Sequence, residues 1–155
     1  MTNQQKPFRI LSLDGGGAKG FYSLGVLREV EAAAGKPLCE AFDLVFGTST
    51  GSIIASLIAL GKSIDEIHAL YRDHVPSVMK PTDRREKTAA LALLAERVYG
   101  DTGFDAVRTR VGIVSCRWAD ERPMIFKGDP AQAHGRHGSF RNEEPPHVGQ
   151  LHGGS

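Results

Sequence analysis

The chain has 155 residues, a length that suits one domain able to bury a hydrophobic core of useful size. Its 19 basic and 18 acidic side chains leave a formal net charge of +1, so no overall field draws it to nucleic acid. The longest apolar run, from Ile53 to Leu60, is far shorter than the roughly 20 residues that cross a bilayer, and we expect no transmembrane segment.

Strand and helix patterns alternate through the first sixty residues. Residues 8–13 form a short apolar segment closed by a run of glycines, which predicts a buried strand. A helix is expected from Gly20 to Ala34, with apolar residues on both flanks and a glycine stop. A second strand over 42–46 leads into a helix at 51–60, which is apolar on nearly all sides, as a helix packed on a sheet would be.

A second helical region follows this apolar helix. Ser63 and Glu66 have the spacing of a capping box, which predicts a helix that begins there and ends near His74. A loop bracketed by two prolines is expected over 76–81. Apolar residues at helical spacing then predict another helix over 86–99.

The last predicted elements are two strands, at 111–115 and 124–126. Strands that alternate with helices indicate an α/β domain with a mainly parallel central sheet. The composition changes over 127–155, which hold six glycines, three prolines and four of the six histidines. Such a segment cannot offset its own ordering entropy, so we expect it to be loosely ordered.

The two cysteines, Cys39 and Cys116, are far apart and form no Cys-x-x-Cys pair. The simplest interpretation is a reducing, cytoplasmic setting in which both are small core residues. The polar start of the chain shows no export signal. We therefore expect a cytoplasmic protein that meets any lipid substrate peripherally, at a membrane surface.

The segment Gly47-Thr48-Ser49-Thr50-Gly51 has the form G-x-S-x-G between an apolar strand and an apolar helix. This is the pattern of a nucleophile elbow, in which a tight turn lifts a serine hydroxyl out of the sheet. The glycines allow the strand and helix backbones to approach, and the helix N-terminus favours developing negative charge. Ser49 is thus a candidate nucleophile. The alternative is that Ser49 only caps the helix.

Residues 15–20 match G-x-G-x-x-G after the first predicted strand, a pattern that also occurs in dinucleotide-binding proteins. Those proteins need an acidic residue at the end of the second strand to hold a ribose, and here that strand ends in Gly47-Thr48-Ser49. A Walker A loop is also disfavoured, because Lys19 is followed by Gly20 and not by Ser or Thr.

An oxyanion hole explains the glycine loop better than a nucleotide site does. Gly15, Gly16 and Gly17 could turn their backbone N–H groups into the space above the sheet, close to the elbow. Lys19 could orient this loop or meet an anionic head group, but a solvated lysine is an equally good interpretation.

Two segments resemble the patatin-like phospholipase family: LSLDGGGAKGFYSLGVL at 11–27 and FDLVFGTSTGSIIA at 42–55. The similarity extends less sharply over residues 8–140. The resemblance implies a three-layer α/β/α fold, a partial patatin-like domain over 1–140, and a disordered or non-native tail over 141–155. It also implies hydrolysis of fatty-acyl esters of phospholipids through a serine acyl-enzyme, with no metal or cofactor.

The family's motifs map onto particular residues of this sequence. The resemblance assigns Ser49 as the nucleophile and Gly15, Gly16 and Gly17 as the oxyanion hole. The region 122–134 is in addition similar to bacterial members, some of which are nucleotide-activated effectors.

The catalytic base is not assigned in this sequence. Family members use a Ser–Asp dyad whose aspartate lies in a D-G-[GA] motif downstream of the serine. No aspartate after Ser49 is followed by Gly-Gly or Gly-Ala, and Asp14-Gly15-Gly16 belongs to the glycine loop. The resemblance therefore implies that the chain ends before the base.

Histidine could replace the missing aspartate only if it were held beside Ser49. Four histidines lie in the glycine-rich tail, which offers little rigid support, and solvated side chains are the favoured interpretation: His134, His137, His147 and His152. His68 and His74 fall on or just after a helix and receive no role.

Three functional hypotheses remain from the sequence. The leading one is a lipid acyl hydrolase with Ser49 as its nucleophile. The second is a catalytically incompetent chain that lacks the dyad aspartate, because an unassisted serine is a weak nucleophile. The third is a nucleotide-binding module that uses the glycine loop. The sequence does not indicate an oligomeric state.

Overall fold

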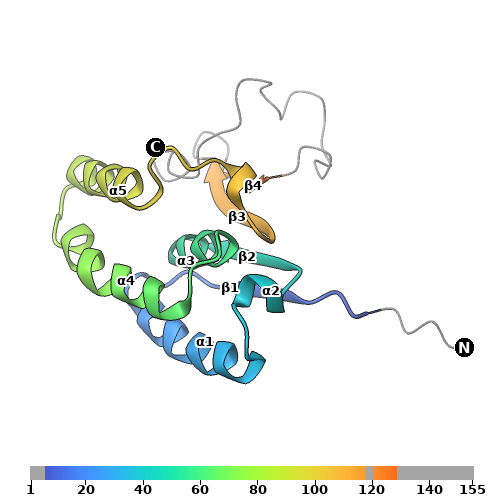
Figure 1. The fold of residues 1–155 in the computed structure, drawn as a ribbon. Helices are drawn as coiled ribbons and strands as arrows, with labels where there is room; N and C mark the ends of the chain where they lie inside the picture. Colours follow the sequence, from blue (N-terminus) through green and yellow to red (C-terminus); the bar gives the residue numbers. More distant parts are fainter. Residues whose placement is uncertain (1–5, 118–120, 129–155) are drawn as a thin grey trace, which may run out of the picture.

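The computed structural model describes residues 6–117 and 121–128, which form one four-stranded sheet with helices packed against it (Figure 1). The strands follow one another across the sheet in chain order: β1 (Ile10–Leu13), β2 (Leu44–Thr48), β3 (Arg110–Arg117) and β4 (Arg122–Lys127). β1, β2 and β3 are parallel, and β4 is antiparallel to β3. The predicted α/β architecture with a mainly parallel sheet is confirmed.

The helices come from the two connections between the parallel strands. They are α1 (Gly20–Ala34), α2 (Leu38–Ala41), α3 (Thr50–Ala59), α4 (Ile64–Met79) and α5 (Arg84–Tyr99). Two short 3-10 helices, η1 (Gly17–Lys19) and η2 (Phe104–Ala106), precede α1 and β3. The predicted tail and the domain boundary at residue 140 lie outside the described residues.

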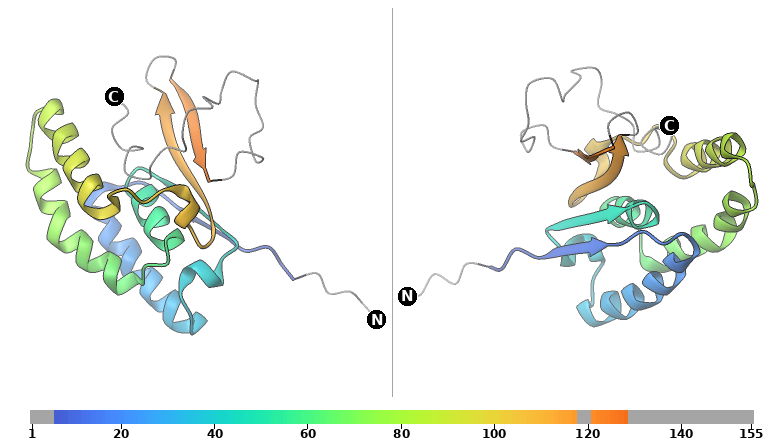
Figure 2. Two further views of the ribbon diagram at one scale, coloured as in Figure 1. Left: turned by 45° about the horizontal axis from the view of Figure 1, so that its top comes forward. Right: turned by 180° about the vertical axis from the view of Figure 1, so that it is seen from behind.

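α3 lies directly against β2 and β3, and α1, α4 and α5 form an arc around it (Figure 2). The alternation of side chains along the strands explains this arrangement. In β1, Leu11 and Leu13 pack into the core, whereas Ile10 and Ser12 point to the opposite, exposed face. Of the expected three layers, the described residues show the sheet and the helical layer on one face.

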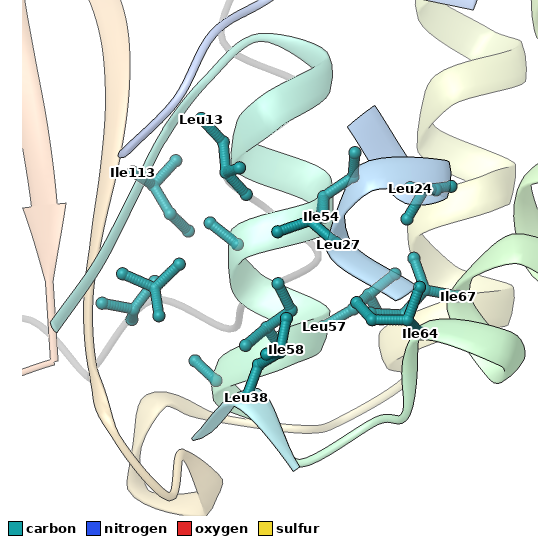
Figure 3. Close-up of a cluster of buried hydrophobic side chains, with 14 of the residues drawn as sticks. Leu13, Leu24, Leu27, Leu38, Ile54, Leu57, Ile58, Ile64, Ile67 and Ile113 are labelled. Carbon is teal, nitrogen blue, oxygen red and sulfur yellow. The ribbon is translucent and has the colours of Figure 1, made fainter. Parts of the chain in front are cut away.

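The hydrophobic core fills the space between the sheet and these helices (Figure 3). α3 is its centre, because every residue from Ile54 to Ala59 is buried. The surrounding elements each contribute large apolar side chains, namely Leu13, Leu24, Leu27, Leu38, Ile64, Ile67 and Ile113. The hydroxyl groups of Ser56 and Tyr99 lie 2.6 Å apart in the interior and satisfy each other.

The structure corrects the predicted end of α4. The helix does not stop near His74 but continues through Pro76 to Met79. A proline inside a helix removes one backbone hydrogen bond. Here Pro76 and Arg72 are both exposed, so water can solvate the carbonyl that loses its partner, while Val75 and Val78 still pack inward.

The structure also corrects the placement of one cysteine. Cys39 is buried as expected, but Cys116 is exposed. In β3, Val111 and Ile113 face the helices, so Cys116 falls on the other face of the sheet. The short helix α2 was not predicted, and β2 begins two residues later than expected and includes Gly47 and Thr48.

The burial of side chains in the core predicts a large difference between two apolar truncations. Ile58 is 0% exposed in α3, whereas Leu93 is 67% exposed in α5. Ile58→Ala should lower the free energy of unfolding by about 2–5 kcal/mol, because it leaves a cavity. Leu93→Ala should change it by about 0.5 kcal/mol or less. Urea denaturation measures both, and equal losses would contradict this description of the core.

Candidate active site

The pairing of β1 with β2 brings the glycine loop to Ser49. Leu13 pairs with Gly47 at the carboxyl ends of these parallel strands, so two residues further on Gly15 comes beside Ser49. A Cβ atom built on Gly15 would lie 2.9 Å from the Ser49 Cβ and 3.6 Å from the Ser49 Oγ. Any side chain at position 15 would therefore crowd the serine. On the other side, β2 and β3 pair as far as Thr48 and Val114, and the next residue of β3, Ser115, lines the same cavity as Ser49.

Ser49 has a backbone conformation that few non-glycine residues adopt, with φ 53° and ψ −124°. It follows β2 directly and precedes the first residue of α3, as a strained strand-to-helix turn requires. The residue is exposed, and its side chain makes no capping hydrogen bond to α3. The alternative that Ser49 serves as a side-chain cap therefore has no support in this geometry.

Gly47 and Gly51 permit this turn because their neighbours are backbone atoms. A Cβ atom on Gly47 would collide with the carbonyl group of Gly51 and come within 2.5 Å of the Ser52 nitrogen. A Cβ atom on Gly51 would collide with the carbonyl oxygen of Leu13 and lie 2.7 Å from that of Asp14. Backbone atoms cannot move aside as a flexible side chain can, so both positions require glycine.

The glycine loop presents unused backbone donors beside Ser49. Among the residues that the structure describes, the N–H groups of Gly15, Gly16 and Gly17 donate no hydrogen bond. The carbonyl oxygens of Gly16 and Gly17 are used, because they accept bonds from Lys19 and Gly20 in η1 and its cap. Free N–H groups near a reacting carbonyl are the donors that an oxyanion hole needs.

The loop also packs on the start of α3. A Cβ atom on Gly20 would lie 2.7 Å from Thr50 Cγ2 and 2.8 Å from Tyr71 Cε1. The Tyr71 hydroxyl donates a hydrogen bond of 3.1 Å to the carbonyl oxygen of Thr50. Burial raises the pKa of Tyr71 well above its usual value, so its phenol stays protonated and remains a donor. Lys19 is exposed.

Ser49 and Gly17 line a cavity of about 360 Å³, which falls within the usual size range of ligand pockets. Its walls come from α3, α4, α5 and β3. α4 contributes Tyr71, Val75 and Val78, and α5 contributes Lys87, Leu91 and Leu94. Each set repeats every three or four residues, so each forms one stripe along its helix.

A smaller cavity of about 40 Å³ lies next to the Ser49 cavity and shares five lining residues with it, Ile53, Tyr71, Val75, Leu91 and Leu94. It adds apolar side chains from deeper in the core, among them Leu57, Ala95 and Val98. The two cavities adjoin along a largely apolar wall, formed by their shared residues of α3, α4 and α5. The sequence showed these residues only as apolar positions of helices, so no signal in it marked them as part of a site.

The described residues that line the Ser49 cavity include no histidine, aspartate or glutamate. The ring of His68 packs edge-on against Phe21, with 5.7 Å between ring centroids, and His74 lines the smaller cavity. The four tail histidines lie outside the described residues. Within the described part of the chain, no three His, Cys, Asp or Glu side chains gather as a metal site would require.

An α/β domain with a G-x-S-x-G turn beside a glycine loop defines a recognisable class of protein. The family model of the patatin-like phospholipases matches residues 11–146. The chain therefore belongs to the patatin-like phospholipase family.

Individual relatives agree with this family. The chain is 61% identical over 132 residues to a cUMP-AMP-activated phospholipase of Escherichia coli, an alignment that covers 85% of this chain and 41% of the relative. It is 30% identical over 139 residues to a cGAMP-activated phospholipase of Escherichia coli strain TW11681, covering 77% and 39%. A human calcium-independent phospholipase A2-gamma is 43% identical over 65 residues, which is 41% of this chain and 8% of that protein. The chain thus spans about two fifths of the length of the bacterial relatives.

The close approach at Gly51 predicts opposite effects for two glycine-to-alanine substitutions in helices. Gly51→Ala should lower the free energy of unfolding by at least about 1–3 kcal/mol, because its Cβ meets fixed backbone atoms. Gly25→Ala, in the middle of α1, should raise it by about 0.5–1 kcal/mol, because nothing lies within 4 Å and alanine favours helix. Thermal and urea unfolding compare them; a Gly51→Ala protein as stable as the parent would refute the packing described.

Proposed function

We propose that this chain carries the nucleophile and the oxyanion-stabilising loop of a lipid acyl hydrolase that cleaves fatty-acyl esters of phospholipids. The observation that carries the proposal is the contact between Gly15 and Ser49, which puts unused N–H groups beside a strained, exposed serine. Family membership and the relatives, which are phospholipases, support the substrate class.

The proposed reaction proceeds through an acyl-enzyme. Ser49 Oγ attacks the ester carbonyl carbon, and the carbonyl oxygen gains negative charge as the tetrahedral intermediate forms. N–H groups of Gly15, Gly16 and Gly17 donate hydrogen bonds to that oxygen. One such donor contributes about 2.7–4 kcal/mol to the transition state in enzymes of this kind. The N-terminus of α3 adds a favourable dipole.

The later steps release both products. The tetrahedral intermediate collapses, the bond from the carbonyl carbon to the alcohol oxygen breaks, and the alcohol leaves with the proton taken from Ser49. Water then attacks the acyl-serine, and its proton returns to Ser49 Oγ as the fatty acid departs. No metal or cofactor takes part in this scheme.

Proton transfer is the step for which the described residues offer no candidate carboxylate. A Ser–Asp dyad, as the family resemblance implies, needs an aspartate beside Ser49, and the cavity lining in the described part of the chain supplies none. A chain that binds lipid without efficient turnover is therefore the second candidate function. The nucleotide-binding alternative gains no support, because β2 ends in Thr48 and leads to Ser49, not to a carboxylate.

The apolar cavity between α4 and α5 is the proposed place for the fatty-acyl chain. It starts at Ser49 and is walled by aliphatic side chains, so an acyl chain could leave water as the ester reaches the nucleophile. No helix within the described residues is long and apolar enough to cross a membrane. The substrate in this proposal is taken up at a membrane surface.

Replacement of Ser49 tests the proposal directly. Ser49→Ala should abolish release of fatty acid from a phospholipid and of p-nitrophenol from a p-nitrophenyl ester, because the attacking oxygen is gone. Ser77→Ala is a matched control, since Ser77 is an exposed α4 residue whose hydroxyl donates a hydrogen bond, within the described part of the chain, to the carbonyl of His74 alone. Turnover retained by Ser49→Ala would refute Ser49 as the nucleophile.

The same assay separates the two candidate functions. If the parent chain shows no serine-dependent turnover, Ser49→Cys becomes informative, because a thiolate is nucleophilic without a neighbouring base. Acylation of Ser49→Cys by p-nitrophenyl octanoate, with an inactive parent, would indicate a formed site that lacks its base.

A further inference from the structure

Lys87 is the one charged side chain among the described residues that line the Ser49 cavity. It forms no ion pair with another described residue. Burial of an uncompensated charge would be costly, and the lysine is in fact exposed, so its ammonium group stands in water at the mouth of the cavity. The cavity therefore has one cationic end.

The rest of the α5 stripe runs away from this cation into the apolar space. Lys87, Leu91 and Leu94 follow one another at intervals of four and three residues on the same side of α5. The seven residue steps from Lys87 to Leu94 span about 10 Å of helix. Leu94 then borders the smaller apolar cavity, whereas Lys87 does not. The cavity is thus polarised, with a positive end and an apolar end.

Two further features make the potential at the Lys87 end positive. Residues 80–87, the connection from α4 and the first turn of α5, contain four basic and two acidic side chains. The N-terminus of α5 carries the positive end of its helix dipole. Asp83 caps α5 and accepts hydrogen bonds from the N–H groups of Arg85 and Glu86, so its carboxylate offsets part of this dipole, and the excess of basic side chains is the feature that remains.

We propose that Lys87 binds the phosphate group of a glycerophospholipid whose acyl chain lies at the apolar end of the cavity. This inference rests on the proposed function and adds a residue that selects phospholipids over uncharged esters. Ser49 and Lys87 line the same cavity, and a glycerophospholipid carries its phosphate only a few bonds from its ester carbonyls. A lysine ammonium recognises phosphate as a compact point charge.

The test uses binding, so it does not depend on turnover. Two non-hydrolysable probes are compared, 1,2-di-O-hexylglycerol 3-phosphate and 1,2-di-O-hexylglycerol, which differ only in the phosphate. Calorimetric titration of the full chain should show tighter binding of the phosphate probe. Lys87→Gln should weaken that binding by about threefold to tenfold, the range for a charge-assisted contact that water partly screens. Binding of the uncharged probe should not change.

Three controls sharpen the result. Lys87→Arg should restore most of the affinity for the phosphate probe, because it keeps the positive charge. Lys80→Gln removes the same charge from the nearby connection at a residue that does not line the cavity, and it should leave the affinity within about twofold. Inorganic phosphate should bind far more weakly than the phosphate probe, because it lacks the apolar chains that occupy the other end of the cavity.

The outcomes are distinguishable from those of the proposed function. Equal loss of phosphate-probe binding in Lys80→Gln and Lys87→Gln, or no loss in Lys87→Gln, would overturn the role of Lys87 while the acyl site stands. Tight, Lys87-dependent binding of inorganic phosphate would also overturn it, since the site would then be one for free anions. If neither probe binds at all, the acyl cavity of the proposed function fails.

Discussion

The site depends on the contact between the first turn of α3 and the ends of β1 and β2, where backbone packs on backbone. A Cβ atom at Gly47 or Gly51 would meet carbonyl and amide groups that cannot move aside. This proximity forces the chain to reverse within a very short segment, and Ser49 takes a positive φ as a result. A conformation of this kind costs about 1–3 kcal/mol. Burial of one large aliphatic side chain contributes about 1.5–3 kcal/mol. α3 buries three such side chains, Ile54, Leu57 and Ile58, and so offsets the strain.

The same contact explains why the Ser49 hydroxyl and the unused N–H groups of the glycine loop lie at one place. Parallel strands end at a common edge of the sheet, and the registered pairing of β1 with β2 brings Gly15 beside Ser49. The helix that follows each strand begins at this edge, so the N-termini of α1 and α3 both point toward it. The apolar space between α4 and α5 opens to this edge through residues such as Tyr71 and Leu91. In the proposed function, the chemistry takes place at the sheet edge and the acyl chain binds within the helical arc.

Much of the fold could be predicted because local signals agreed with the tertiary structure. The extent of α1 and the capping box of α4 are as expected, because Gly35 caps the end of α1 and Ser63 caps the start of α4. The predicted end of α4 was wrong, because it rested on the low helix propensity of Pro76 and took no account of the inward packing of Val75 and Val78. Cys116 was misplaced because a residue type alone does not reveal which face of a strand it occupies.

The candidate site could be predicted only where the backbone itself needs special residues. Gly47, Ser49, Gly51 and the glycine loop stand out in the sequence because few other residues can adopt those conformations or approaches. The cavity lining could not be recognised in this way. In the sequence, Leu91 and Leu94 have the same helical spacing as core residues, and Lys87 resembles any exposed lysine. Only the placement of α4 and α5 beside Ser49 in the structure shows that these residues line its cavity.

An acyl group attached at position 49 reports on the oxyanion role of the glycine loop without the need for a catalytic base. Ser49→Cys, made with Cys39→Ala and Cys116→Ser to leave a single thiol, is acylated with p-nitrophenyl octanoate and followed by NMR of the backbone amides. At least two of the amide protons of Gly15, Gly16 and Gly17 should move downfield as they bond to the acyl oxygen. If these three amides stay unchanged while the acyl group is attached, the glycine loop does not hold the oxyanion.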